Sequence, residues 1–171
     1  MSSLRNVIAL AAIVAALSLT ACGFSPMYGS AAGSQGVSAV EGLDKVDIAM
    51  IPDEEGVFLR NILIDHFYRG GYPSSPAYTL QVQKIRMTEA DLDITRESES
   101  TRRQIRLRTV MSLRNNTTGE TVLTRNITAV TSYNVLGSQF TTRVSERDAR
   151  EAALSDMARQ IENQVVLYFK Q

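Results

Sequence analysis

The chain of 171 residues contains a single cysteine, Cys22, and a single histidine, His66. A disulfide within the chain would require a second cysteine, and a metal site would usually require a cluster of His and Cys ligands that is absent. A catalytic thiol would require a histidine base, and no sequence feature connects His66 to Cys22. Covalent modification of the Cys22 thiol is the stronger remaining explanation.

The residues before Cys22 support this explanation. Arg5 is the only charged residue in 1–6, and residues 7–19 form the apolar run VIALAAIVAALSL. A positive start followed by a short apolar run is typical of a secretory signal peptide, and the run is short for a transmembrane helix. We therefore predict a signal peptide over residues 1–21.

The end of this segment, Leu19-Thr20-Ala21-Cys22, resembles the lipobox of bacterial lipoproteins. The resemblance implies that the thiol is alkylated with diacylglycerol, that the signal is cleaved before Cys22, and that the new amine is acylated. Two or more acyl chains give stable membrane anchoring. Gly23 occupies the position where an Asp would imply retention in the inner membrane, so we expect the outer membrane, on its periplasmic face.

The rest of the chain is predicted to form a lipidated, flexible tether over residues 22–44 and a single domain over residues 45–171. The 18 basic and 18 acidic residues balance, so overall charge indicates no partner. Tryptophan is absent and aromatic residues make up only 6% of the chain, which argues against an aromatic-lined site for sugars or nucleobases. We predict no cofactor, no metal and no nucleic-acid partner.

The first half of the predicted domain begins with a short strand and a helix. Residues 46–51 form an apolar run that ends at Pro52, and Asp53 is expected to cap the helix that follows. Gly70-Gly71 is expected to end this helix. Helical spacing predicts a buried stripe of Phe58, Leu59, Ile62, Leu63 and Phe67. His66 lies beside the stripe and is interpreted as an ordinary packed or partly solvated helix residue.

Three strands and a second helix are predicted next. Tyr78, Leu80 and Val82 alternate, but the apolar phase then shifts to Ile85 and Met87, which predicts a bulge or bend near Gln83. The other two strands cover 105–113 and 123–135 and are joined by a turn at 115–120. The last helix is expected to begin at Ser145, with Asp148 in a weak capping box. Its predicted stripe is Leu154, Met157, Ala158, Ile161, Val165 and Tyr168.

This order predicts an α+β fold, a β-α-β-β-β-α two-layer sandwich with two helices packed on one face of a four-stranded mixed sheet. The other face would be polar and free to meet a partner. The residues expected there are Thr79, Gln81, Gln83, Gln104, Arg106, Arg108 and Arg114.

Two segments, "CGFSPMYG" after the signal and "FLRNILIDHF" in the first helix, resemble the alphaproteobacterial form of the lipopolysaccharide-assembly lipoprotein family, LptE. The predicted order of strands and helices also agrees with that family's fold. The resemblance implies a non-enzymatic protein that sits as a plug inside a large outer-membrane β-barrel of the LptD type. There it would help the barrel to assemble and take part in delivering lipopolysaccharide to the cell surface. Residues 89–102 match no pattern of the family, so their role stays open.

Half of all basic residues lie between Lys84 and Arg125. Arginine suits phosphate and carboxylate partners because its planar group donates two parallel hydrogen bonds. Lipopolysaccharide or acidic residues of the barrel are therefore candidate partners. The candidate contact residues are Arg103, Arg106, Arg108 and Arg114. The alternative is a solvated strand face, or salt bridges with acidic residues of the intervening loop, namely Glu89, Asp91, Asp93, Glu97 and Glu99.

Two other functions remain open at this point. A lipoprotein that binds or carries lipid on its own would be favoured by an apolar pocket large enough for acyl chains. A lipid-anchored hydrolase lacks support, because no G-x-S-x-G motif is present and the only histidine lies on an ordinary helix face. We predict that the protein is not an enzyme.

Overall fold

The computed structural model describes residues 42–94, 100–135 and 137–170. The predicted signal peptide, Cys22 and most of the predicted tether lie outside the described residues. The described part begins with Gly42 and with Leu43, whose side chain is buried in the hydrophobic core. None of the helices in the described ranges is both long enough and apolar enough to span a membrane.

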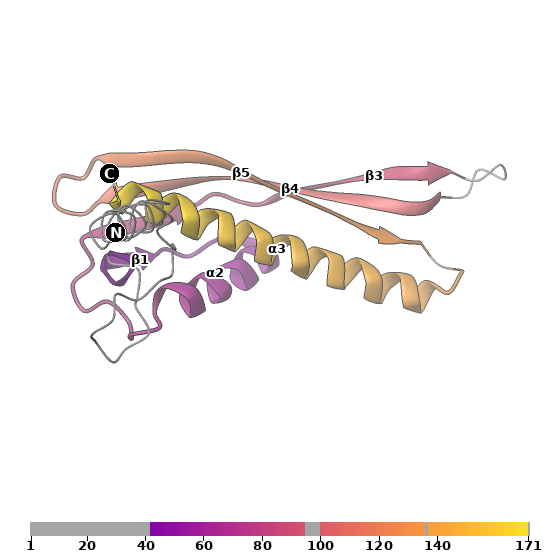
Figure 1. Cartoon of the computed structure of the whole chain (residues 1–171), viewed down its shortest axis with the longest axis horizontal. Helices are drawn as coiled ribbons and strands as arrows, with labels where there is room; N and C mark the ends of the chain where they lie inside the picture. The colour runs from indigo at the N-terminus through magenta and orange to yellow at the C-terminus, as the bar shows by residue number, and fades with distance from the viewer. Residues whose placement is uncertain (1–41, 95–99, 136, 171) are drawn as a thin grey trace, which may run out of the picture. The chain divides into compact units, whose positions relative to one another are not determined.

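The fold consists of two long helices and a five-stranded mixed sheet, with both helices on the same face of the sheet (Figure 1). The elements in chain order are η2 (Leu43–Lys45), β1 (Val46–Ile48), α2 (Asp53–Phe67), β2 (Tyr78–Val82), β3 (Arg86–Ile94), β4 (Ser100–Asn115), β5 (Thr121–Asn134) and α3 (Gln139–Phe169). The predicted α+β class and the placement of the helices are confirmed. The strand count is corrected from four to five.

The fifth strand arises at the predicted irregularity near Gln83. β2 and β3 both pair antiparallel with β4, β2 over residues 111–115 and β3 over residues 100–108. Between them the N–H of Gln83 donates to the carbonyl of Val110 (2.9 Å), and Thr109 Oγ1 donates to the carbonyl of Gln83 (2.7 Å). The break therefore divides one predicted strand into two that follow the same edge of β4.

The remaining pairs complete the sheet. β5 pairs antiparallel with the opposite edge of β4, and β1 is parallel to β2. The predicted turn at 115–120 is confirmed, because β4 ends at Asn115, β5 begins at Thr121, and Gly119 takes a positive φ of 76°.

The interpretation of 89–102 as part of an intervening loop is wrong over most of its length. β3 continues to Ile94 and β4 begins at Ser100, and the two pair as a hairpin with register shifts around Asp93. Described side chains on this part of β3, including Glu89 and Leu92, are exposed. Because residues 89–92 and 101–102 are exposed on both faces of the hairpin, the sequence carries no alternation there that would mark a strand.

The stripe of α2 is confirmed at its centre. Leu59, Leu63 and Phe67 are buried, and Phe58 and Ile62 are partly buried against the same core. The helix ends at Phe67, before the predicted Gly70-Gly71 stop.

The capping role predicted for Asp53 is wrong. Asp53 has a left-handed φ of 66°, and α2 has no side-chain cap at its N-terminus. Its carboxylate instead accepts a hydrogen bond from Lys84 Nζ at 2.9 Å, just beyond the end of β2. This ion pair therefore links the start of α2 to the break between β2 and β3.

The start predicted for α3 is also wrong, because the helix begins at Gln139 and includes Ser145 and Asp148. Residues 139–148 contain no Gly or Pro to interrupt a helix, and they lack a buried stripe that would reveal one. Phe140, for example, is 78% exposed. The stripe farther along is confirmed, since Leu154, Met157, Ala158, Ile161 and Val165 are buried.

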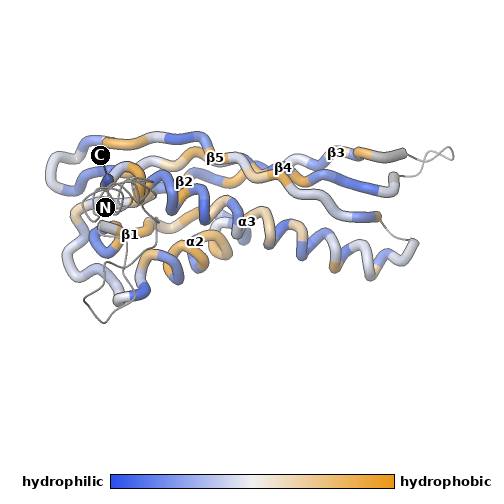
Figure 2. The backbone as a smooth tube through the Cα atoms, viewed as in Figure 1, coloured by the Kyte–Doolittle hydropathy of each residue, from blue (hydrophilic) through white to orange (hydrophobic). Residues whose placement is uncertain are grey.

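The core is formed by buried apolar residues of both helices and of the sheet. Figure 2 shows apolar residues along both layers. α2 packs alongside only part of α3. Glu55, near the start of α2, has a side-chain oxygen 3.9 Å from a guanidinium nitrogen of Arg150, and His66, near the end of α2, contacts Glu162. Residues 139–149 of α3 therefore extend beyond α2. Tyr68, just after α2, accepts a hydrogen bond from the N–H of Ile48 at 3.0 Å, and burial raises the pKa of its hydroxyl.

We predict that Leu63→Ala and Ile161→Ala will each destabilise the fold by about 2–5 kcal/mol, because both side chains are fully buried and truncation leaves a cavity. Equilibrium unfolding by denaturant measures the effect. Val57→Ala, at a half-exposed position of α2, is the control and should change the free energy of unfolding little. If neither core variant differed from this control, the assignment of the buried helix faces would be wrong.

Candidate interaction surface on the open face of the sheet

The side chains of β4 alternate between the two faces of the sheet, and this alternation decides on which face each predicted arginine lies. The odd-numbered residues of β4 from Ile105 to Leu113 are buried, so they point toward the helices. Successive side chains of a strand point to opposite faces, so the even-numbered residues lie on the face without helices. We call this side the open face.

Three of the four predicted arginines share the open face: Arg106, Arg108 and Arg114. Arg106 and Arg108 are adjacent on it, whereas Arg114 is six residues, or about 20 Å, farther along the strand. Arg106 Nη2 donates to Gln104 Oε1 (3.3 Å), and Arg114 Nε donates to the carbonyl of Gly119 (3.2 Å). Within the described ranges no carboxylate forms an ion pair with any of the three.

Arg103 is separated from the other three because it occupies an odd-numbered position, on the side of the helices. Its Nε donates to Asp91 Oδ1 at 2.9 Å. Hydrogen bonds with Asp91 and with Tyr133 raise the pKa of the Arg103 guanidinium. The predicted alternative of a salt bridge with a nearby acid is thus realised at Arg103.

Two further basic residues, absent from the predicted set, complete a cluster with Arg108. Arg86 on β3 is directly opposite Arg108 in the strand register, and Lys84 lies in the break before it. Like charges directly opposite on a sheet are unfavourable, so this pairing is not explained by stability. The hydrogen bond to Asp53 raises the pKa of the Lys84 ammonium, which favours its charged form. Only the register reveals Arg86 as a neighbour of Arg108.

These three basic residues border a shallow depression of about 420 Å³ on the open face. Its other lining residues are uncharged: polar ones such as Gln83, Asn126 and Thr128, and the apolar Val110 and Ile127. Its chemistry suits an anionic group, because cations and amide donors surround it and acidic residues are missing from its lining.

The open face around the depression is cationic. Its positions on the central strands are Arg86, Thr88 and Ala90 on β3, Arg102, Gln104, Arg106, Arg108, Val110, Ser112 and Arg114 on β4, and Thr124, Asn126, Thr128, Val130, Ser132 and Asn134 on β5. None of the positions named is acidic, but Asp93 of β3, beyond Ala90, is the register partner of Arg102. The face combines short polar and apolar side chains with arginines and so presents a positive surface.

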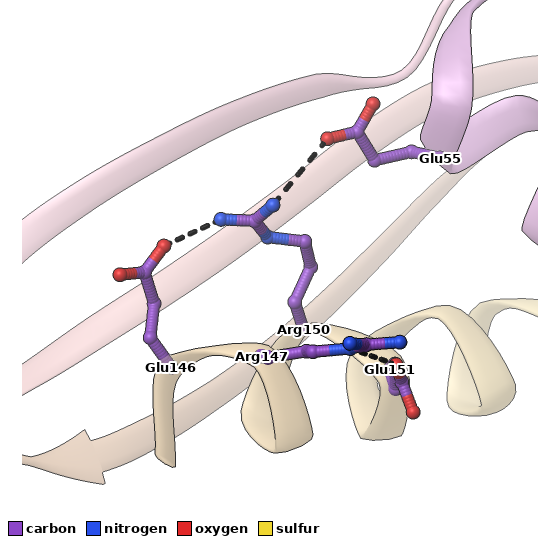
Figure 3. A network of polar contacts seen from close by, with 5 residues as sticks. All are labelled: Glu55, Glu146, Arg147, Arg150 and Glu151. Atoms are coloured by element: carbon purple, nitrogen blue, oxygen red, sulfur yellow. Dashed lines mark hydrogen bonds and ion pairs between the residues drawn. The ribbon is translucent and has the colours of Figure 1, made fainter. Parts of the chain in front are cut away.

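A second depression, also of about 420 Å³, lies between the start of α2 and the first half of α3. It contains the ion pairs of Figure 3, in which Arg150 contacts Glu55 and Glu146 while Arg147 contacts Glu151. Phe58 and Leu154 are its apolar members. The charged lining of both depressions does not match the apolar pocket expected of a stand-alone lipid carrier.

The other residues considered from the sequence have these positions. His66 Nδ1 lies 2.9 Å from Oε2 of the nearly buried Glu162, so His66 joins α2 to α3, and its interpretation as a packed helix residue is confirmed. No grouping of His, Cys, Asp and Glu in the described ranges is suited to hold a metal ion. Cys22 lies outside those ranges, so its lipidation stays a prediction.

Comparison with solved structures shows that the fold is shared with bacterial proteins of low sequence identity. A protein from Caulobacter crescentus CB15 has a TM-score of 0.61 at 18% identity, over 77% of this chain and 95% of its own. The minor lipoprotein from Acinetobacter baumannii has a TM-score of 0.55 at 20% identity, over 72% and 92%. Rare lipoprotein B from Shewanella oneidensis has a TM-score of 0.54 at 10% identity, over 74% and 98%.

Comparison by sequence defines the family. No curated protein matches the chain directly. The model of the LptE family, described as lipopolysaccharide-assembly, matches residues 43–167 and thus includes every helix and strand described above except the last residues of α3. The chain is a member of the LptE lipopolysaccharide-assembly family.

Proposed function

We propose that this protein is a non-enzymatic outer-membrane lipoprotein that plugs and helps to assemble an LptD-type β-barrel. In that role it takes part in the transport of lipopolysaccharide to the cell surface. The observation that carries the proposal is the family match over residues 43–167, which includes almost the whole fold.

The open face supports a role in binding rather than in catalysis. It places Arg86, Arg106 and Arg108 close together, and no acidic residue lies directly opposite any of the three in the register. Lipid A and the inner core of lipopolysaccharide carry phosphate and carboxylate groups, and acidic residues can line a barrel. Both would satisfy these arginines through charge-assisted hydrogen bonds.

Anchoring is assigned to Cys22 on the evidence of the sequence. The apolar signal segment and the Leu19-Thr20-Ala21-Cys22 motif supply the processing site, and acyl chains on Cys22 would hold the protein on the outer membrane. The folded domain would then face the periplasm and enter the lumen of the barrel.

We predict that Cys22→Ala will leave the protein unprocessed or release it into the soluble periplasmic fraction, because the acyl chains that anchor it can no longer be attached. Fractionation followed by immunoblotting measures the change. Mass spectrometry of the wild-type N-terminus should show acyl chains on Cys22. A free, unmodified thiol in wild-type protein extracted from membranes would contradict the assignment.

We predict that changing Arg106 and Arg108 together to Glu will weaken binding to one anionic partner much more than either single change, because repulsion replaces attraction at two adjacent positions of the open face. A single exposed ion pair contributes only about 0–1 kcal/mol, so either single substitution should have a small effect. Co-purification with the barrel and binding of purified lipopolysaccharide are measured separately. Arg69→Glu with Lys170→Glu, at exposed positions outside the strands, is the control with the same change in charge.

The pattern of loss identifies which partner the arginines contact. If they contact lipopolysaccharide, the double variant still co-purifies with the barrel but binds less lipopolysaccharide, and salt weakens wild-type binding. If they contact the barrel, co-purification itself fails. Normal binding to both partners would show that these arginines are only a solvated face.

A further inference from the structure

The sheet has three free edges, and two of them are protected against pairing with another strand. β1 forms one outer edge and is only three residues long. The free edge of β3 carries Glu89 and Asp91 and has register shifts on either side of Asp93. Short strands, charged residues and irregular register are the features by which proteins prevent edge-to-edge association.

The third edge, formed by β5, has none of these features over nine residues. Residues 126–134, with the sequence NITAVTSYN, contain no charged residue, no proline and no glycine. Their pairing with β4 runs without a register shift from Leu123 to Asn134. Ile, Val, Thr and Tyr favour extended strands, so this segment is a regular edge that can pair with another strand.

The hydrogen bonds show which main-chain groups of β5 lie at the free edge. The N–H of Val135 donates to Thr101 of β4 at 3.0 Å, whereas the carbonyl of Thr128 accepts from Gln160 Nε2 of α3 at 3.1 Å. Consecutive residues of an antiparallel strand direct their N–H and C=O groups to opposite edges. Odd-numbered residues of β5 therefore bond to β4, and even-numbered residues point away from it.

Beyond Thr128 the edge is open. The even-numbered residues there are Val130, Ser132 and Asn134, and no donor or acceptor in the described ranges reaches their main-chain N–H and C=O groups. Val130 is 49% exposed and Asn134 is exposed. A row of unpaired main-chain groups on a regular strand is a template for one more strand.

We propose that residues 130–134 of β5 receive an extended segment of the barrel protein, which adds to the sheet as a further strand. This inference rests on the proposed function, because that function supplies the partner. The N–H and C=O groups of Val130, Ser132 and Asn134 form the new main-chain hydrogen bonds.

The open face specifies the side chains of the added segment. Arg106 lies opposite Val130 in the register, and Arg108 lies opposite Thr128. An added strand would lie about 5 Å beyond β5. Because Val130 and Thr128 are short, the longer arginine side chains can extend over them toward that strand. The partner segment therefore carries acidic residues at alternate positions, on the side of the open face.

The first test is proline substitution in the full-length, lipidated protein. Val130→Pro removes an N–H that points away from β4, so the pairing of β5 with β4 is kept while an added strand is blocked. Glu89→Pro is the matched control, because the same alternation places its N–H at the free edge of β3. We expect Val130→Pro to reduce about tenfold the amount of barrel protein that co-purifies per amount of lipoprotein. Glu89→Pro should leave this ratio unchanged.

The second test leaves every main-chain N–H of the edge in place. A photo-crosslinking amino acid in place of Asn134, and another in place of Glu89 as control, is activated in intact cells. Mass spectrometry then identifies the partner and the crosslinked peptide. We expect Asn134 to crosslink to an acidic, extended segment of the barrel and Glu89 to give no such product.

The outcomes separate this inference from the proposed function. If the barrel co-purifies with the wild type, but Val130→Pro has no effect and Asn134 crosslinks no more than Glu89, the edge inference is overturned and the proposed function stands. Crosslinking of Asn134 to a second copy of this chain would likewise overturn the assigned occupant. If no barrel co-purifies with the wild type, the proposed function fails, and the edge inference fails with it.

Discussion

The fold depends on the burial of one face of β4. This strand pairs with β2 and β3 along one edge and with β5 along the other, so three of the other four strands are positioned by it. Its residues Ile105, Leu107, Met111 and Leu113 are all fully buried beneath the helices. A shift of one residue would move these side chains to the open face and bring the arginines into the core, so burial fixes the register. The same constraint that forms the core therefore forms the cationic surface.

The elements that the sequence predicted correctly are those that bury a single face. Leu59 and Leu63 on α2, and Met157 and Ile161 on α3, recur at helical spacing because one side of each helix lies against the core. Residues 89–92 of β3 and the first turns of α3 were missed because they have no buried side chain to mark one face. Asp53 was misassigned for another reason: capping is a local preference, and the distant Lys84 competes successfully for its carboxylate.

The candidate surface was predicted only in part. Arg106 and Arg108 share a face because they are two residues apart on one strand, which sequence spacing can show. Arg103 was grouped with them by proximity, although its odd number already placed it with Ile105 on the other face. Arg86 is different, because its position beside Arg108 depends on the pairing of β3 with β4 across the break at Gln83. Pairing between strands cannot be inferred from the composition of either strand alone.

The unequal lengths of the two helices have a consequence for dynamics. α2 has 15 residues and α3 has 31, so the first turns of α3 lack the second helix that stabilises its later turns. Free energies of local opening are lowest where few apolar contacts hold the main chain. Among the described helices, amide hydrogen exchange should thus be faster at residues 139–149 than around Leu63 and Ile161. The open part of the β5 edge, at residues 130–134, lies toward these first turns of α3, so a strand added there would meet the least supported part of the helix layer.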